Sequence, residues 1–418
     1  MQQSRRLAVS MVCGGIATFA DLYAIQAVLP ALSDQMHINE SVASLAISVA
    51  TGALALTVLP WAAVADRIGR ARAMKIATII AAITGLLAPF APTIAILLIL
   101  RALSGAALAA VPALAMAHLV EHAVPGRSVA MGGLYIAGTS VGGLIGRILT
   151  GTVAGIVGGA NGWRWGLAAT AIAVVVLAVI FAVSLPKDSL PNEASPRKAP
   201  PRLTRGQRHT SNHTHTDAGG APPRQQRRIH QAMRGSAVWS LYLQGFLLMG
   251  GFVTMYNLLA FRLLAPPYLV PASLVSLLFV IYLVGTASSS LVGRLVGRFG
   301  RRRIVMAGGG GVAAGALLTL AHPLALIIAG LIVVTFSFFL AHAVAAAWVG
   351  VLVPSARSQA TALYSLTYYL GSSVVGYVGA LVFMHSGWSG AAGMVAMAAV
   401  IAVAIAAKAA PREPFKRV

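Results

Sequence analysis

Long apolar runs dominate the sequence, and short polar or proline-containing turns separate them. An α-helix needs roughly 20 consecutive apolar residues to cross a bilayer, and twelve runs approach or exceed that length. They occupy approximately residues 7–32, 41–63, 74–91, 93–119, 128–157 and 164–185, and then 237–261, 272–293, 303–321, 324–350, 358–384 and 388–408. The pattern predicts an all-α membrane protein with twelve transmembrane helices.

The composition favours the same class of protein. The chain is 58% apolar and only 10% charged, whereas soluble domains average about 25% charged residues. The first apolar run is too long for a cleaved signal peptide, and it carries Asp21. Because Cys13 is the single cysteine, no intrachain disulfide is possible.

The basic residues indicate the topology. Of the 31 Lys and Arg residues, all but Arg101, Arg147, Arg164 and Arg262 lie in the termini or in loops and span ends of one face. Basic residues collect on the cytoplasmic side of membrane proteins, so we expect both termini in the cytoplasm. The net charge of +22 then reflects topology and contact with anionic lipid headgroups, and no nucleic-acid partner is expected.

One segment differs from the rest of the chain. Residues 186–236 are rich in Pro, Arg, Gly and His, as in PRKAPPRLTRGQRHTSNHTHTDAGG. Such a composition cannot bury a core, so we expect a disordered basic cytoplasmic linker there. It separates a six-helix bundle over residues 1–185 from a second bundle over residues 237–418.

The two halves repeat each other. YIAGTSVGGLIGRI (135–148) aligns without gaps to YYLGSSVVGYVGAL (368–381), and DRIGR (66–70) matches GRFGR (297–301). A weaker match sets Asp21 opposite Asn257. The repeat predicts two pseudo-symmetric six-helix bundles with a binding site between them, which is a plan typical of transporters.

The segment AAVADRIGRAR resembles the loop motif that follows the second helix in the major facilitator superfamily. The two copies supply Asp66, Arg67, Gly69 and Arg70, and then Arg298, Gly300 and Arg301. The resemblance implies a cytoplasmic gate in which Asp66 docks near Ser358, at the start of the eleventh helix. The alternative is a basic loop that only sets the topology.

Two further segments resemble the same superfamily. RALSGAALA is similar to its fourth-helix R-x-x-Q-G motif, with Ser104 in place of Gln. The glycine-rich fifth helix is similar to the motif of proton-driven exporters, without its proline. With GLYIAGTSVGGLIGR and SLTYYLGSS, these features resemble bacterial inner-membrane drug:proton antiporters and arabinose-efflux-like permeases, which implies proton-coupled efflux.

Three charged residues lie at middle to outer depth within the predicted spans: Asp21, Arg101 and Arg147. Charges in hydrocarbon are costly unless they are paired or hydrated, so they are expected to face the bundle interior. Asp21 is the candidate proton carrier, because a carboxylate that moves between environments can load and release a proton. The alternative is a static Asp–Arg pair that locks the helices together.

Arg147 borders a face formed by Gly138, Gly142 and Gly146, which recur every four residues and predict close packing against another helix. Arg147 and Arg101 are therefore predicted to offset Asp21 or to bind anionic or hydroxyl groups of a substrate. The alternative for Arg147 is a purely interhelical hydrogen bond to backbone carbonyls.

Other predicted cavity residues share polar or aromatic side chains on the first, seventh and tenth helices, which line the cavity in the resembled fold. They are Tyr23, Gln26, Gln244, Tyr256, Asn257, His342 and Trp348. His118 and His122 stand four residues apart, but without a further ligand they predict no metal site. No nucleotide-binding or zinc-hydrolase motif occurs, so no cofactor and no enzymatic activity are expected.

We therefore expect a monomeric secondary transporter in the bacterial inner membrane. It would move a small organic solute by alternating access, with proton-coupled efflux as the expected mode. The alternatives are proton-coupled import of a small polar or anionic solute and a membrane sensor that transports nothing.

Overall fold

The computed structural model describes residues 2–123, 128–186 and 224–411, and within these ranges it contains helices and no strand. The α-helices are α1 (Gln2–Ala24), α2 (Leu29–Met36), α3 (Glu40–Ile68), α4 (Arg70–Leu87), α5 (Ile94–Leu108), α6 (Ala110–His122), α7 (Ser128–Val157), α8 (Gly162–Ser184), α9 (Arg224–Ala232), α10 (Ser236–Leu264), α11 (Ala272–Leu277), α12 (Tyr282–Phe299), α13 (Arg301–Leu318), α14 (Leu324–Leu352) and α15 (Arg357–Ala409). The 3-10 helices are η1 (Ile25–Val28), η2 (Ala88–Phe90), η3 (Leu278–Ile281) and η4 (Pro354–Ala356).

The helices confirm the predicted twelve-span membrane fold. Ten helical segments among the described residues are long and apolar enough to cross a membrane. The last of them turns back at Gly387, whose φ of 60° is non-helical, and so supplies two spans rather than one. With α13, these segments make twelve, and their positions follow the predicted apolar runs.

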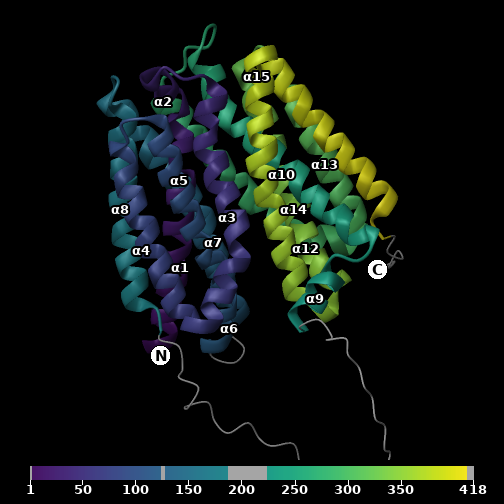
Figure 1. The fold of residues 1–418 in the computed structure, drawn as a ribbon. Coiled ribbons are helices and arrows are strands. Elements are labelled where there is room, and N and C mark those ends of the chain that lie inside the picture. The colour runs from purple at the N-terminus through teal and green to yellow at the C-terminus, as the bar shows by residue number, and fades with distance from the viewer. Residues whose placement is uncertain (1, 124–127, 187–223, 412–418) are drawn as a thin grey trace, which may run out of the picture.

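The spans form two bundles, with α1–α8 in one and α10–α15 in the other (Figure 1). The turn between α3 and α4 and the turn between α12 and α13 show the internal repeat directly. Gly69 has φ 89° and Gly300 has φ 80°, a backbone conformation that favours glycine. The matching DRIGR and GRFGR motifs therefore fold into the same tight turn in each bundle.

The predicted linker is partly helical. Its last residues form α9, where Ala232 is fully buried and its carbonyl accepts a hydrogen bond from the Tyr242 hydroxyl at 2.9 Å. This corrects the prediction of disorder for residues 224–232, because α9 packs against the second bundle and gains tertiary contacts. Residues 187–223 of the predicted linker lie outside the described residues.

Among the described residues, the two bundles share an apolar core on one side only. We call the side where α1 begins and α8 ends the termini face, and the other side the opposite face. Toward the opposite face a single apolar core includes Leu29 of the first bundle and Phe252 of the second. Toward the termini face the cores are separate, around Met74 in one bundle and Trp348 in the other. The bundles accordingly diverge toward the termini face (Figure 1).

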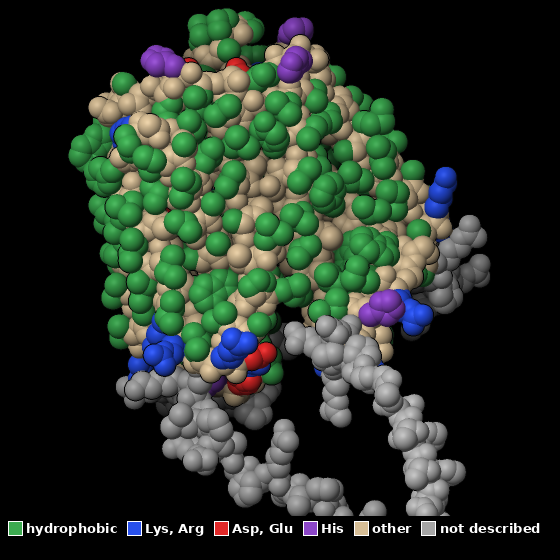
Figure 2. Space-filling model, in the orientation of Figure 1, with side chains coloured by type: hydrophobic (Ala, Val, Ile, Leu, Met, Phe, Trp, Pro, Cys, Tyr) green, Lys and Arg blue, Asp and Glu red, His purple; other side chains and the backbone are tan. Residues whose placement is uncertain are grey.

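The surface matches a protein embedded in a bilayer. Apolar side chains cover the middle of the molecule, and Lys and Arg side chains gather toward the termini face (Figure 2). The two arginines near the opposite face, Arg164 and Arg262, cap helix ends by donating hydrogen bonds to backbone carbonyls. Arg164 donates to the carbonyls of Pro89 (2.5 Å) and Ala91 (3.0 Å), and Arg262 donates to the carbonyl of Thr319.

The glycine face of α7 packs directly on the backbone of α1. A Cβ atom at Gly138, Gly142 or Gly146 would lie 2.8, 2.3 or 2.5 Å from a carbonyl oxygen of α1. These distances leave no room for a side chain, which is the packing role that we predicted for the three glycines. The contact fixes α1 and α7 to each other.

Gly142→Ala is expected to destabilise the fold by about 1–3 kcal/mol, the usual cost of overpacking a close contact. Thermal unfolding of the purified protein in detergent measures the loss. Gly133→Ala is the matched control, because a Cβ at Gly133 of the same helix meets nothing within 4 Å. Equal melting temperatures for the two variants would contradict the close α1–α7 contact.

Candidate functional site

Among the described residues, two membrane-spanning segments contain an internal 3-10 turn. The first span changes from α1 to the 3-10 turn η1 and then to α2, which begins at Leu29-Pro30. The second bundle has a similar interruption at η3, between α11 and α12. Such breaks are tolerated inside a membrane protein where side chains or neighbouring helices satisfy the freed backbone groups. Each break lies beside a cluster of polar side chains.

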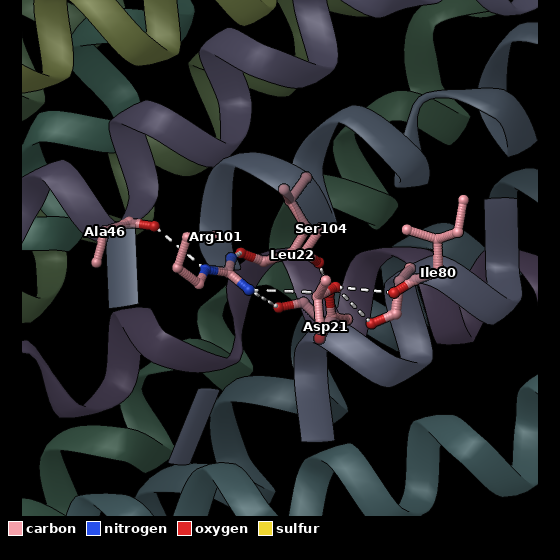
Figure 3. Close-up of polar contacts among 8 residues, drawn as sticks. Asp21, Leu22, Ala46, Ile80, Arg101 and Ser104 are labelled. Atoms are coloured by element: carbon pink, nitrogen blue, oxygen red, sulfur yellow. Dashed lines mark hydrogen bonds and ion pairs between the residues drawn. The ribbon is translucent and has the colours of Figure 1, made fainter. Parts of the chain in front are cut away.

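The first cluster contains Asp21, Arg101 and Ser104, and we call it the intrabundle cluster (Figure 3). The Ser104 hydroxyl donates to the Asp21 carboxylate, and the Arg101 guanidinium lies 3.8 Å from the same carboxylate oxygen. Both charged side chains are buried. This arrangement is a desolvated ion pair held by an additional hydrogen bond.

Arg101 also binds backbone carbonyls of two other helices. Its guanidinium donates to the carbonyls of Asp21 (3.1 Å) and Leu22 (2.6 Å) in α1 and of Ala46 (3.2 Å) in α3. The first two carbonyls lie where α1 gives way to the 3-10 turn. Arg101 therefore joins α1, α3 and α5, as expected for the alternative in which it locks helices together.

The Asp21 carboxylate points into the first bundle. A Cβ atom at Gly85 of α4 would lie 2.7 Å from the Asp21 Oδ1 atom. The carboxylate thus lies among α1, α4 and α5 and does not face the second bundle. The glycine at position 85 provides the space that the carboxylate occupies.

The second cluster joins the two bundles, and we call it the junction cluster. Arg147 of α7 donates through Nε to the Gln26 side chain at 2.5 Å and through Nη2 to the Tyr282 hydroxyl at 3.2 Å. Gln26 in turn donates to the Asn257 side chain of α10 at 2.5 Å. Arg147, Gln26 and Asn257 were predicted separately from the sequence, and the structure brings them into one network.

Aromatic rings surround the Arg147 guanidinium. Its carbon lies 4.3 Å from the ring centre of Tyr23, 4.5 Å from that of Tyr282 and 5.1 Å from that of Phe279. Cation–π contacts of this kind stabilise a desolvated cation. Among the described residues, no carboxylate lies within ion-pair distance of Arg147. The predicted pairing of Arg147 with Asp21 is therefore not formed, because Asp21 faces α4.

The remaining predicted cavity residues lie in different parts of the second bundle. The Tyr256 and Thr335 hydroxyls form a hydrogen bond of 2.7 Å, and the Tyr256 ring stacks against Phe279 beside the junction cluster. His342 is half-buried and lies 3.0 Å from the Tyr364 hydroxyl. Trp348 is instead buried in the core of the second bundle near the termini face, so it is a packing residue here.

The predicted gate residues lie at the termini face. Asp66 and Arg67 are exposed, and no hydrogen bond or ion pair within the described ranges joins Asp66 to α15. Arg70 instead pairs with Glu121 at the end of α6. The separate apolar cores of the two bundles on this side account for the missing contact between Asp66 and α15.

The sequence interpretation did not find Tyr282 and Phe279. Both lie in the apolar segment LLFVIYLV (277–284), which includes the 3-10 helix η3. Aromatic residues near a break in a membrane helix are the sequence signal that points to them. Without the structure, their position beside Arg147 of the other bundle is not visible.

The family profile of the Major Facilitator Superfamily matches residues 11–270 and 247–418, which together cover nearly the whole chain. The chain belongs to the major facilitator superfamily. Two bundles related by an internal repeat, each with the same glycine turn, agree with this assignment.

Two relatives extend over almost the same length. The inner membrane transport protein YnfM of Escherichia coli (strain K12) is 34% identical over 388 residues, covering 93% of this chain and 86% of the relative. The MFS-type transporter YybF of Bacillus subtilis (strain 168) is 32% identical over 386 residues, covering 92% and 89%. Both relatives are named as transporters.

Solved structures show the same fold at low sequence identity. A bacterial homologue of the lysosomal transporter Spinster, in an inward-facing occupied conformation, matches with a TM-score of 0.73 and 14% identity over 97% of this chain and 95% of that chain. The xylose transporter XylE of E. coli, in a partially occluded inward-open conformation, matches with a TM-score of 0.72 and 14% identity over 99% and 100%.

Arg101→Gln is expected to lower the free energy of unfolding by about 3–5 kcal/mol, because it leaves Asp21 buried without its cation. The measurement is thermal or denaturant unfolding in detergent. Arg67→Gln serves as the control, since Arg67 is exposed. If the two variants unfold alike, Arg101 does not hold the helices together.

Proposed function

We propose that this protein is a secondary active transporter that moves a small organic solute across the bacterial inner membrane by alternating access. The observation that carries the proposal is the junction cluster, where a buried arginine of one bundle is linked through Gln26 to Asn257 of the other. Such a link lies where a transporter of this fold binds its solute, between two repeats that rock about a fixed site. The protein acts as a monomer in this proposal.

The conformation described here is inward-facing in this proposal. The termini face carries most of the basic residues and is therefore assigned to the cytoplasm, with both termini inside. The bundles share a core toward the opposite face and have separate cores toward the termini face. In the outward-facing state this asymmetry is reversed, and Asp66 approaches the start of α15 to close the gate with Arg67 and Arg70.

The chemistry of the junction cluster favours a neutral polar or anionic solute with an apolar or aromatic part. Arg147 supplies a positive charge that no carboxylate of the described residues neutralises, and its neighbours Tyr23, Phe279 and Tyr282 supply aromatic surface. A solute oxygen can replace the Tyr282 hydroxyl as a partner of Arg147. Gln26 and Asn257 then offer further hydrogen bonds to the solute.

Asp21 carries the coupling proton in this proposal. Among the described residues it is the only buried acid, and its carboxylate is held by Ser104 and Arg101. Its backbone neighbours lead directly into η1, which carries Gln26 of the junction cluster. A change in the protonation of Asp21 can therefore alter the position of Gln26 through a few residues of the same segment.

Efflux is the proposed direction, on the strength of the resemblance of the fifth helix to proton-driven exporters. Proton-coupled import of the same class of solute is the alternative, because the same cluster can serve either direction. The sign of solute flux under an imposed pH gradient distinguishes the two.

A disulfide across the closed side is expected to stop transport. A Cβ atom at Gly52 of α3 would lie 3.5 Å from the Ser373 Cβ of α15, which fits the roughly 3.5–4.5 Å of a disulfide. In a Cys13→Ser background, Gly52→Cys with Ser373→Cys should cross-link and abolish solute flux, and reduction should restore it. Loss of free thiols by mass spectrometry reports the cross-link.

The matched control pair is Asp66→Cys with Ser358→Cys at the termini face. This control pair should form a disulfide in protein that is free to change conformation. It should not form one after the disulfide between positions 52 and 373 has formed. Undiminished flux through the protein locked at Gly52 and Ser373 would refute alternating access between the bundles.

The proposed function itself is tested by a panel of solutes in proteoliposomes under an imposed pH gradient, with proton and solute movement recorded together. Asp21→Asn is expected to abolish proton-driven flux while solute exchange without a gradient continues. Arg147→Gln is expected to raise the KM by about 10- to 100-fold, the value of a hydrogen bond to a charged group.

Circular dichroism and gel filtration of both variants show whether they assemble as the parent protein does. Coupled flux that is unchanged in Asp21→Asn would remove Asp21 from the mechanism. An unchanged KM in a well-assembled Arg147→Gln variant would leave Arg147 with packing as its only role.

A further inference from the structure

The end of α6 carries three potential metal ligands within one helical turn. The sequence His118-Leu-Val-Glu121-His122 places them at positions i, i+3 and i+4, which share one face of a helix. We propose that His118, Glu121 and His122 form a Zn²⁺ site, and that binding of the ion releases Arg70 from Glu121. The proposal is independent of the solute and of the direction of transport.

The ligand atoms are already close together. One nitrogen of each histidine and one Glu121 oxygen all lie within 4.8 Å of one another. The two imidazole rings stack with their centres 4.1 Å apart and their planes 28° apart. Small side-chain rotations bring the three atoms to a single ion, since Zn–N and Zn–O bonds are about 2.0–2.2 Å long.

The hydrogen bond of His122 orients it as a metal ligand. Its Nδ1 atom lies 2.9 Å from the His118 carbonyl oxygen, so Nδ1 carries the proton and Nε2 is the nitrogen presented to a metal. Metal-binding histidines usually donate their second nitrogen to a carbonyl or carboxylate in this way. The interaction fixes both the tautomer and the ring orientation.

The donor set favours zinc over the hard cations. Two imidazoles and one carboxylate are the protein ligands of many Zn²⁺ sites that keep a fourth position for water, whereas Mg²⁺ prefers oxygen ligands. His118 is fully buried, while the Glu121 side chain is 50% exposed. The ion can therefore approach from the exposed side, past Glu121.

Arg70 competes with the metal for Glu121. It begins α4, directly after the Gly69 turn, and its guanidinium forms an ion pair with the Glu121 carboxylate. A bound Zn²⁺ replaces the guanidinium as the partner of that carboxylate. The freed Arg70 belongs to the DRIGR motif at the termini face, so occupation of the site changes the charges available to the proposed gate.

Isothermal titration of the purified full-length protein with ZnCl₂ tests the site. The protein used for the titration contains the substitutions His209→Asn, His213→Asn and His215→Asn, which remove three other histidines as possible ligands. We expect one Zn²⁺ per chain and no response to MgCl₂. His122→Asn should weaken binding more than about 100-fold, because loss of an outer-sphere partner alone costs about 10–100-fold.

Arg70→Gln distinguishes the proposed competition from independent binding. It should tighten Zn²⁺ binding by about two- to fivefold, the value of a partly exposed ion pair, and Glu121→Gln should weaken it. His230→Asn on α9 is the matched control and should leave the affinity unchanged. His122 is half-buried, so its variant tests the site even if His118→Asn fails to fold.

Two results would overturn the proposal. If His122→Asn binds Zn²⁺ as tightly as the parent protein does, the ion binds at another site. Affinity that is unchanged or weaker in Arg70→Gln would show that Arg70 does not compete for Glu121, and the release of Arg70 by zinc would then be wrong.

Discussion

Two guanidinium groups lie where water is scarce, and the protein supplies the solvation that water would give. Arg101 is surrounded by backbone carbonyls, two of them at the point where α1 becomes a 3-10 turn. Arg147 is surrounded by oxygen acceptors and aromatic rings. Because an unsolvated charge in a bilayer is so costly, the carbonyls beside the interrupted helix and the aromatic cluster both stabilise these buried arginines. The two polar clusters of the molecule follow from that single constraint.

The fold could be predicted from the sequence because the bilayer allows few alternatives. An apolar run of the required length must be a helix, so the spans and the duplicated bundles are visible in the pattern alone. The close contact of α7 was equally visible, since glycines at every fourth position line one helix face. The composition did not predict α9, because it is a polar helix. Its packing against the second bundle depends on a few contacts, such as the hydrogen bond between Tyr242 and Ala232.

The candidate site was only partly visible in the sequence. Sequence position indicates that Asp21 and Arg147 lie at similar depth, but it does not show which way each side chain points around its helix. The structure turns Asp21 toward Gly85 and Arg147 toward Gln26, so the two charges that looked like partners belong to different clusters. Likewise, the pairing of Arg70 with Glu121 connects residues 51 positions apart in sequence, and no local pattern reveals it.

In the proposed alternating-access cycle, the glycine contact between α1 and α7 determines which hydrogen bonds of the junction cluster must break. Backbone atoms of the two helices touch, so neither helix can slide along the other and they travel as one body. Gln26 follows α1 and Arg147 lies on α7, so their mutual hydrogen bond is carried along intact. Within the junction cluster, the hydrogen bonds that cross to the other bundle are Gln26–Asn257 and Arg147–Tyr282. In the proposed cycle these two break, together with the hydrogen bond from the Ser373 hydroxyl to the Ser48 carbonyl. Arg147 would thus retain its hydrogen bond to Gln26 throughout the proposed cycle, whereas Gln26 would lose Asn257 and Arg147 would lose Tyr282.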